Sequence, residues 1–267
     1  MPFFLTGDGV RLHYAADDFT DPWRSAPTVV LLHAAMGSLE RFRAWLPALA
    51  RDFRVVRLDT RGHGGSATPR PETELTIDRL ARDVAELLDH LGVARAHVSG
   101  SSAGGYVAQH LAATRPERVA RLALFSSAPG LSHSTVRLDD WLALVRARGA
   151  GGLLEATLAA RVDPARVEPG FVRWMVDAAQ PMDREFTCRF LTLMAGLDLS
   201  DRLGEIRAPT LIVEAGGDTV NTQAGYGLLR RIPNHEVVVY EGLPHNITNG
   251  APERCASDLR RFLLADA

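Results

Sequence analysis

Short runs of apolar residues recur along the chain and predict strands that are buried on both faces of a sheet. Such runs are typical of parallel strands, because helices cover both faces of a parallel sheet. Two further runs, Phe3–Leu5 and Val10–Tyr14, flank a turn at residues 7–9 and predict an antiparallel hairpin. The predicted buried strands are Val29–Leu32, Val55–Leu58, Ala96–Ser99, Leu122–Phe125, Leu211–Glu214 and Val237–Tyr240.

Helical patterns separate these strands. The clearest runs from Ile77 to Leu91, with apolar residues three and four positions apart, Thr76 as N-cap and Gly92 as the stop. Another helical stretch covers Leu259–Leu264. Because strands alternate with helices, the sequence predicts an α/β fold with a mostly parallel sheet flanked by helices.

The alternation of strands and helices breaks between the strand at 122–125 and the strand at 211–214. No strand pattern occurs there, and glycines and prolines separate four helical stretches: Leu138–Arg148, Leu153–Arg161, Glu168–Ala179 and Arg184–Ala195. We predict that residues 129–198 form a small helical lid inserted in a core made of residues 1–128 and 199–267.

Residues 100–104 form a G-x-S-x-G motif with Ser102 at its centre, between a predicted strand and a helical pattern. A nucleophile on such a sharp turn needs small residues two positions before and after it, and both are glycine here. Ser101 and Ser99 are alternatives in register, but the small-residue spacing fits them less well. A phosphate-binding loop is the other interpretation, yet the chain has neither a G-x-G-x-x-G fingerprint nor a P-loop lysine.

A serine hydroxyl is weakly nucleophilic and needs a base. Asp218 and His245 each follow a predicted strand, so both reach the carboxyl edge of the sheet. We expect His245 to take the proton of Ser102 and Asp218 to orient His245. The two backbone amides of an oxyanion hole are predicted at Ala103, next after the nucleophile, and at Ala35, in the loop after the strand at 29–32.

Together these motifs resemble the α/β-hydrolase superfamily. The His33 loop, the stretch 59–66, and the Ser102, Asp218 and His245 loops fall in the order of that family. The resemblance implies an α/β-hydrolase fold and cleavage of a substrate through an acyl-enzyme intermediate.

Two segments, 55–64 and 198–203, are similar to 3-oxoadipate enol-lactonases, which implies an ester or lactone substrate, with an enol-lactone among the options. The chain departs from the family pattern in its oxyanion loop, where Ala34 and Met36 stand in place of the usual glycine and a common proline.

Several other activities share this catalytic constellation and stay open. They are hydrolysis of a carbon–carbon bond in a ring-cleavage product, haloperoxidase-like perhydrolysis, hydroxynitrile cleavage, and ligand reception without catalysis. The carbon–carbon hydrolases often have tryptophan after the catalytic histidine, where this chain has Asn246. Haloalkane dehalogenases and epoxide hydrolases are disfavoured, because their nucleophile is aspartate.

Other residues are weaker candidates for contact with a substrate. A substrate carboxylate would need an arginine, and we consider three arginines of the lid as candidates. His133 is a candidate to face the pocket, whereas His97 and His110 are expected to be structural, and Arg61 and His63 to brace their loop. The candidate arginines are Arg137, Arg184 and Arg189, and apolar residues that could line a pocket or form ordinary core are Trp141, Trp174, Met175, Phe186, Phe190 and Met194.

Composition narrows the functional classes. The chain has 267 residues, 46% hydrophobic and 23% charged, as expected for one globular domain with a modest insertion. All 30 basic residues of the Lys+Arg count are arginine, which excludes Schiff-base lysine chemistry and with it pyridoxal phosphate. Neither Cys188 nor Cys255 belongs to a C-x-x-C pair, and we expect no metal and no cofactor.

The net charge of -2 and the interspersed arginines and carboxylates argue against a nucleic-acid partner. No apolar run reaches the roughly 20 residues of a membrane span, and residues 1–8 lack a signal-peptide pattern. We therefore expect a cytoplasmic protein that acts on a small-molecule ester or lactone away from membranes. The oligomeric state stays open, with a homodimer as one option.

Overall fold

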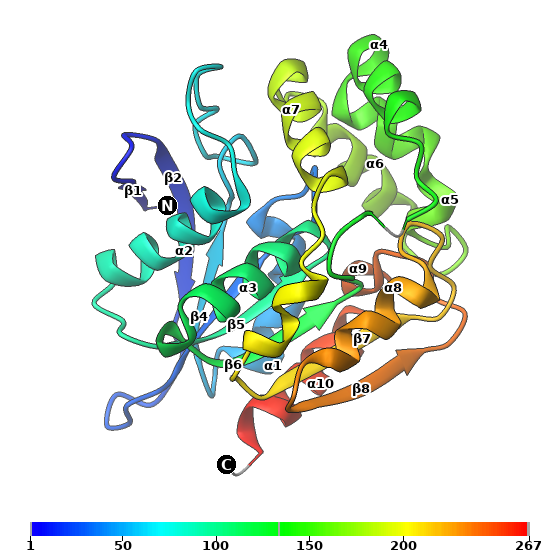
Figure 1. Cartoon of the computed structure of the whole chain (residues 1–267). Coiled ribbons are helices and arrows are strands. Elements are labelled where there is room, and N and C mark those ends of the chain that lie inside the picture. Colours follow the sequence, from blue (N-terminus) through cyan, green and yellow to red (C-terminus); the bar gives the residue numbers. More distant parts are fainter. Residues whose placement is uncertain (1, 133, 266–267) are drawn as a thin grey trace.

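The computed structural model describes residues 2–132 and 134–265 of the chain (Figure 1). Its strands form one sheet in the order β1-β2-β4-β3-β5-β6-β7-β8. β1 and β2 pair antiparallel, as does β2 with β4, and all the other pairs are parallel. This confirms the predicted hairpin and the mostly parallel sheet. The strands are β1 (Phe3–Leu5), β2 (Arg11–Asp17), β3 (Thr28–Leu32), β4 (Arg54–Leu58), β5 (Ala96–Ser101), β6 (Val119–Phe125), β7 (Thr210–Ala215) and β8 (His235–Tyr240).

Helices cover both faces of the sheet (Figure 1). Side chains alternate along each strand, so Val30 and Leu32 join one apolar cluster while Val29 and Leu31 join the other. The first cluster includes residues of α2 (Ile77–His90), α3 (Ala103–Thr114), η3 (Ser200–Glu205), α8 (Gln223–Leu228) and η4 (Leu229–Arg231). The second includes residues of η1 (Leu39–Trp45), α1 (Leu46–Leu49) and α10 (Pro252–Leu264), and the short connecting helices are η2 (Pro116–Arg118) and α9 (Ile247–Gly250).

Helix α2 forms where the apolar spacing predicts it. The Thr76 hydroxyl caps its first turn by accepting a hydrogen bond from the Arg79 amide at 3.1 Å. Gly92 follows the helix with φ +68°, a left-handed conformation that glycine adopts without strain. The predicted cap and stop of this helix are confirmed.

Strand β8 differs from the prediction that every apolar strand is buried on both faces. Val239 is 37% exposed, and most of its strand is only partly buried. The reason is the position of β8 at the edge of the sheet, where it pairs with β7 alone.

Four α-helices follow β6, with η3 between them and β7, and these α-helices lie together in the upper right part of Figure 1. We call them the lid helices. They share an apolar cluster that includes Leu142, Leu153 and Met175. Gly149 has φ 75° and ψ 179°, which are not helical values, and it divides the first of them into two helical segments, as the sequence predicted. The lid helices are α4 (Leu138–Ala156), α5 (Leu158–Arg161), α6 (Pro169–Ala179) and α7 (Arg184–Ala195).

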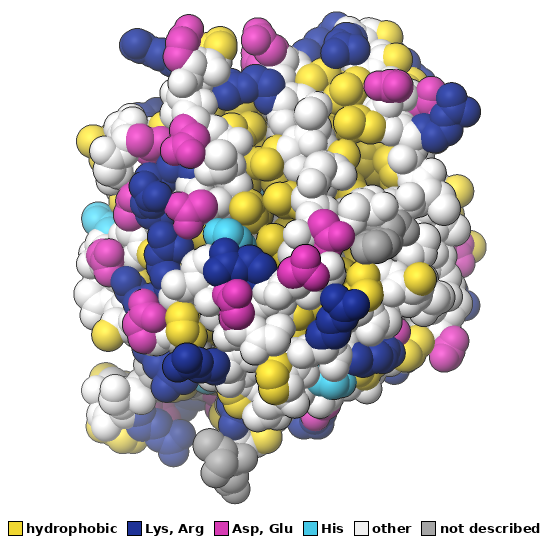
Figure 2. Space-filling model, in the orientation of Figure 1, with side chains coloured by type: hydrophobic (Ala, Val, Ile, Leu, Met, Phe, Trp, Pro, Cys, Tyr) yellow, Lys and Arg dark blue, Asp and Glu magenta, His cyan; other side chains and the backbone are white. Residues whose placement is uncertain are grey.

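The surface carries charges of both signs side by side. Figure 2 shows arginine and acidic side chains interspersed over the face that it presents. Across the described ranges, no helix combines the length and the apolar character needed to cross a membrane. Both cysteines are free, and Cys255 is buried.

Candidate active site

Ser102 lies on the sharp turn between β5 and α3. Its backbone has φ 51° and ψ -117°, which is a strained conformation for any residue except glycine. Hydrogen bonds on both sides hold this turn: the Ser102 amide donates to the Phe125 carbonyl at 3.0 Å, and the Ser127 hydroxyl donates to the Ser102 carbonyl at 2.9 Å. The fold therefore holds Ser102 in a conformation that it would not adopt in an isolated segment.

The two glycines around Ser102 are required by space. A Cβ on Gly100 would lie 2.3 Å from the Gly104 carbonyl oxygen. A Cβ on Gly104 would lie 2.3 Å from the carbonyl oxygen of Leu32 in β3. Helix α3 thus starts in close contact with the neighbouring strand, and the hydroxyl is presented at the end of the sheet.

The three residues predicted to act together lie in one hydrogen-bonded chain. His245 Nε2 is 2.8 Å from Ser102 Oγ, and His245 Nδ1 is 2.8 Å from Asp218 Oδ2. His245 is 2% exposed, so the imidazole is shielded from solvent. This arrangement can move a proton from the serine hydroxyl to a histidine that a carboxylate orients.

Asp218 is held by donors on both of its oxygens. The Val220 and Asn221 amides donate to Oδ1 at 2.7 and 3.1 Å, and the Tyr226 hydroxyl donates to Oδ2 at 2.5 Å. Burial alone would raise the pKa of Asp218, but the attraction of His245 and these hydrogen bonds outweigh it and hold the pKa below its usual value. The carboxylate stays ionised beside the imidazole.

Tyr226 is a partner of this site that sequence reasoning missed. It lies in α8, and burial together with the charge of Asp218 holds its pKa well above the usual value, so the hydroxyl keeps its proton and acts as a donor. No motif marks it, because its distance to Asp218 depends on how α8 packs beneath the loop.

Ala35 and Ala103, the predicted sources of the oxyanion-hole amides, line the same small cavity as Ser102. Among the described residues, neither amide donates a backbone hydrogen bond. Met36, the residue after Ala35, adopts φ 59°. Proline cannot reach this value, because its ring fixes φ near -65°. A proline at position 36, as in the family pattern, would therefore require another backbone conformation in this loop.

His33 braces the loop that carries Ala35. Its Nδ1 donates to the Ala34 carbonyl at 2.8 Å, and its Nε2 accepts from the Thr60 amide at 3.1 Å. Burial lowers the pKa of His33, so the ring is neutral and can act as donor and acceptor at once.

The cavity at Ser102 is small and lies between the core and the lid. The volume open to the centre of a water-sized sphere is about 20 Å³, which is room for about one water. Core residues in the lining are Ala34, Ala35, Met36, Ser102, Ala103, Tyr106, Val220 and His245, and those of the lid side are Leu131, Trp141, Arg161, Leu191 and Met194.

A larger groove of about 870 Å³ lies elsewhere, along α7, and none of Ser102, Asp218 and His245 lines it. Arg184 and Arg189 line this groove and donate to backbone carbonyls. These two candidates for a carboxylate clamp are therefore not brought to the cavity.

The remaining candidates from the sequence divide in the same way. Arg137 is exposed and pairs with Asp140, and Trp174 is also exposed. Trp141 and Met194 line the cavity, whereas Met175, Phe186 and Phe190 belong to the apolar clusters.

The histidine candidates also lie away from the cavity where they are described. His133 lies outside the described residues. His97 packs edge-on against Phe53, and His110 Nε2 lies 3.5 Å from an Asp78 oxygen.

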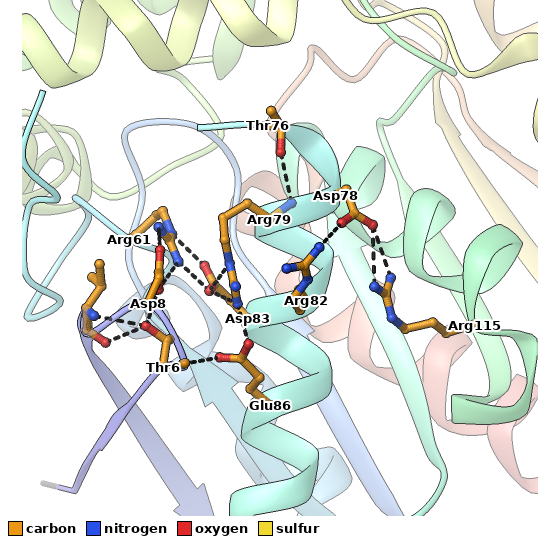
Figure 3. A network of polar contacts seen from close by, with 12 residues as sticks. Thr6, Asp8, Arg61, Thr76, Asp78, Arg79, Arg82, Asp83, Glu86 and Arg115 are labelled. Carbon is orange, nitrogen blue, oxygen red and sulfur yellow. Dashed lines mark hydrogen bonds and ion pairs between the residues drawn. The ribbon is translucent and has the colours of Figure 1, made fainter. Parts of the chain in front are cut away.

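Arg61 lies in an ion-pair network that joins the turn after β1 to helix α2 (Figure 3). It donates to both oxygens of Asp83 at 2.7 and 2.5 Å and to Asp8 at 2.8 and 3.2 Å. His63 Nδ1 lies 3.0 Å from the Arg61 carbonyl, and the imidazole packs edge-on against Phe190 of α7. Neither residue lines the cavity, and both tie their loop to neighbouring elements.

Within residues 2–132 and 134–265, no cluster of three or more His, Cys, Asp or Glu side chains could hold a metal ion.

The amino-acid sequence is similar to those of several known bacterial proteins. It is 32% identical over 241 residues to the dihydrolipoyllysine-residue acetyltransferase component of an acetoin cleaving system from Pseudomonas putida, with 88% of this chain covered. The chain spans 63% of the length of that relative. It is 28% identical over 252 residues to 3-oxoadipate enol-lactonase 2 from Acinetobacter baylyi, covering 90% of this chain and 91% of the relative.

A solved structure agrees with these matches. The enol-lactonase from Burkholderia xenovorans superposes with a TM-score of 0.90 at 27% identity, covering 98% of this chain and 99% of the other. Residues 27–161, about half of the chain, match the sequence family described as the alpha/beta hydrolase fold. The resemblance read from the motifs is confirmed, and the chain belongs to the alpha/beta hydrolase fold family.

Proposed function

We propose that the protein is a serine hydrolase that cleaves a carboxylic ester or a lactone through an acyl-enzyme intermediate. The observation that carries this proposal is the chain of two 2.8 Å contacts from Ser102 through His245 to Asp218. The strained backbone of Ser102 supports it, because strain of this kind clusters at active sites.

In the first step the Ser102 oxygen attacks the substrate carbonyl carbon while its proton passes to His245 Nε2. The carbonyl oxygen gains the negative charge, and the amides of Ala35 and Ala103 stabilise it. The tetrahedral intermediate then collapses, the bond to the leaving oxygen breaks, and the proton on His245 goes to that oxygen. A lactone follows the same course, except that its leaving oxygen stays attached to the acyl chain.

In the second step a water molecule attacks the ester carbonyl of the acyl-enzyme and gives a proton to His245. Collapse of this second intermediate releases a carboxylic acid, and Ser102 takes back the proton. Asp218 stays ionised throughout and stabilises the imidazolium form of His245. No external redox partner is required by these steps.

An enol-lactone is one substrate consistent with the relatives, since a curated relative and a solved structure are both named enol-lactonases. We propose that residues 129–198 act as the lid that selects the substrate. Its residues contribute one side of the cavity at Ser102, so a change there alters the space beside the reacting carbonyl.

The experiment that tests the nucleophile is labelling with a fluorophosphonate probe, combined with turnover of p-nitrophenyl esters. The natural chain should be labelled once and should hydrolyse the esters, and Ser102→Ala should do neither. Ser101→Ala is the matched control, since its hydroxyl is buried one residue away, 3.3 Å from the Thr248 hydroxyl, and it should keep the labelling.

Other outcomes separate this proposal from its rivals. A labelled serine without turnover of any ester, lactone or ring-cleavage product would favour a ligand receptor. Equal labelling of the natural chain and Ser102→Ala would contradict the nucleophile, and faster cleavage of a dienone carbon–carbon bond than of any ester would contradict the ester or lactone substrate.

A further inference from the structure

Arg161 ends helix α5 and carries a buried positive charge on the lid side of the cavity. It is 5% exposed and lines the cavity together with Ser102 and His245. Its Nη2 is buried and has no hydrogen-bond partner among the described residues. A buried guanidinium nitrogen without an acceptor is rare, because the desolvation of the charge is left uncompensated.

The rest of the side chain is held firmly. Its Nε donates to the Thr157 hydroxyl at 2.8 Å, and the guanidinium lies over the Trp141 ring, 5.4 Å from its centroid. The Arg161 carbonyl accepts from the Asn246 amide at 2.7 Å, and the Ala160 carbonyl accepts from the His245 amide at 3.2 Å. Thr157 and Trp141 therefore hold the side chain, and backbone hydrogen bonds join residues 160 and 161 to the loop that carries His245.

No carboxylate forms an ion pair with Arg161 in the described part of the chain. Burial lowers its pKa to about 10, against the opposing attraction of Asp218, so the guanidinium stays charged at neutral pH. Arg41 adds a second positive charge nearby: burial and the repulsion of Arg161 lower its pKa to about 9. Among the described residues that line the cavity at Ser102, Arg161 carries a positive charge and none is a carboxylate.

We propose that Arg161 binds a carboxylate of the substrate, so that the preferred ester or lactone is anionic. A carboxylate would supply the acceptor that Nη2 lacks and would compensate the desolvated charge. Because the same cavity holds Ser102, the carboxylate and the reacting carbonyl belong to one small molecule. This inference rests on the proposed hydrolase function and defines its substrate class.

The first test needs no variant. It compares kcat/KM for two pairs of esters that differ only in charge, after subtraction of spontaneous hydrolysis. In one pair the charge is on the acyl side: mono-p-nitrophenyl glutarate and its methyl ester. In the other it is on the leaving side: 4-acetoxybenzoate and its methyl ester. The anion should be preferred by about tenfold or more in at least one pair, because a hydrogen bond to a charged group is worth that factor.

The second test removes the charge. Arg161→Met should reduce kcat/KM for the preferred anion by about 10- to 100-fold more than for its neutral methyl ester, mostly through KM. Arg161→Lys should restore part of the difference, because it restores the positive charge. Arg137→Met is the matched control, since it removes one charge from an exposed position of the lid, and it should not change the preference.

The outcomes distinguish this inference from the proposed function. Ester turnover that depends on Ser102, without preference for the anion in either pair, overturns the role of Arg161 and leaves the hydrolase intact. Equal losses on the charged and the neutral ester in Arg161→Met also overturn it. Turnover that persists in Ser102→Ala contradicts the proposed function itself.

Discussion

At the scale of single residues, the site depends on charges whose state is fixed by their neighbours. Asp218 is ionised because hydrogen bonds from His245, Tyr226 and two backbone amides favour its carboxylate. The tautomer of His245 follows from this, since its Nδ1 must carry the proton to donate to Asp218. Its Nε2 is then free to accept the proton of Ser102.

Replacement of Asp218 by asparagine tests this reasoning. Asp218→Asn should lower kcat by about 10³- to 10⁴-fold, because an amide cannot stabilise the imidazolium and can hold the wrong tautomer. The measurement is ester hydrolysis under saturation, with circular dichroism to verify folding. Asp201→Asn, a change at an exposed carboxylate, is the control and should keep full activity. A decrease of kcat below tenfold in Asp218→Asn would contradict the proposed role of Asp218 in orienting and stabilising His245.

At the scale of elements, the sharp turn between β5 and α3, which carries Ser102, depends on close packing. The first turn of α3 approaches β3 so closely that a Cβ on Gly104 would meet the Leu32 carbonyl at 2.3 Å. The glycine is therefore a condition for the contact between helix and strand, and this contact in turn sets where Ser102 lies.

Gly104→Ala should destabilise the protein by about 3 kcal/mol, because a backbone atom has to move to relieve the overlap. Urea unfolding followed by circular dichroism measures the change in the free energy of unfolding. Gly227→Ala is the matched control, since Gly227 lies in α8 with nothing within 4 Å of the added carbon. That substitution should stabilise the protein by roughly 0.5–1 kcal/mol. The prediction fails if both substitutions have the same sign.

At the scale of the whole molecule, the lid and the core share one buried contact around His63. The imidazole lies 4.7 Å from the Phe190 ring and 6.0 Å from the Phe186 ring, both in α7. Burial, followed by the repulsion of His33, lowers the pKa of His63 to about 3. The folded protein therefore keeps this histidine neutral where the unfolded chain would protonate it.

The global stability should consequently fall in mild acid. Because the pKa of His63 is depressed in the folded state, its contribution is fully present above pH 6.5 and is lost as the pH falls from 6.5 towards 3. One proton of difference gives a slope of up to about 1.4 kcal/mol per pH unit. Urea unfolding between pH 6 and pH 4 should show a shallower slope for His63→Gln than for the natural chain, and equal slopes would refute this account.

The sequence by itself determined the parallel sheet, the hairpin, helix α2 and the family. These follow from local patterns, because apolar runs, caps and the spacing of glycines act over a few residues. The order of motifs also selected Ser102, Asp218 and His245, which the structure brings within hydrogen-bond distance and whose catalytic roles remain predictions.

Only the tertiary structure decided which charged side chains reach the cavity. Arg137, Arg184 and Arg189 carry the same local signals as Arg161, yet only Arg161 lines the cavity at Ser102. The packing of the lid helices against the His245 loop makes that choice, as the packing of α8 places Tyr226 beside Asp218. Contacts between residues far apart in the chain produce no periodic pattern and no motif. Local motifs in the sequence therefore predict the reacting residues, whereas the packing of the elements determines which side chains surround them.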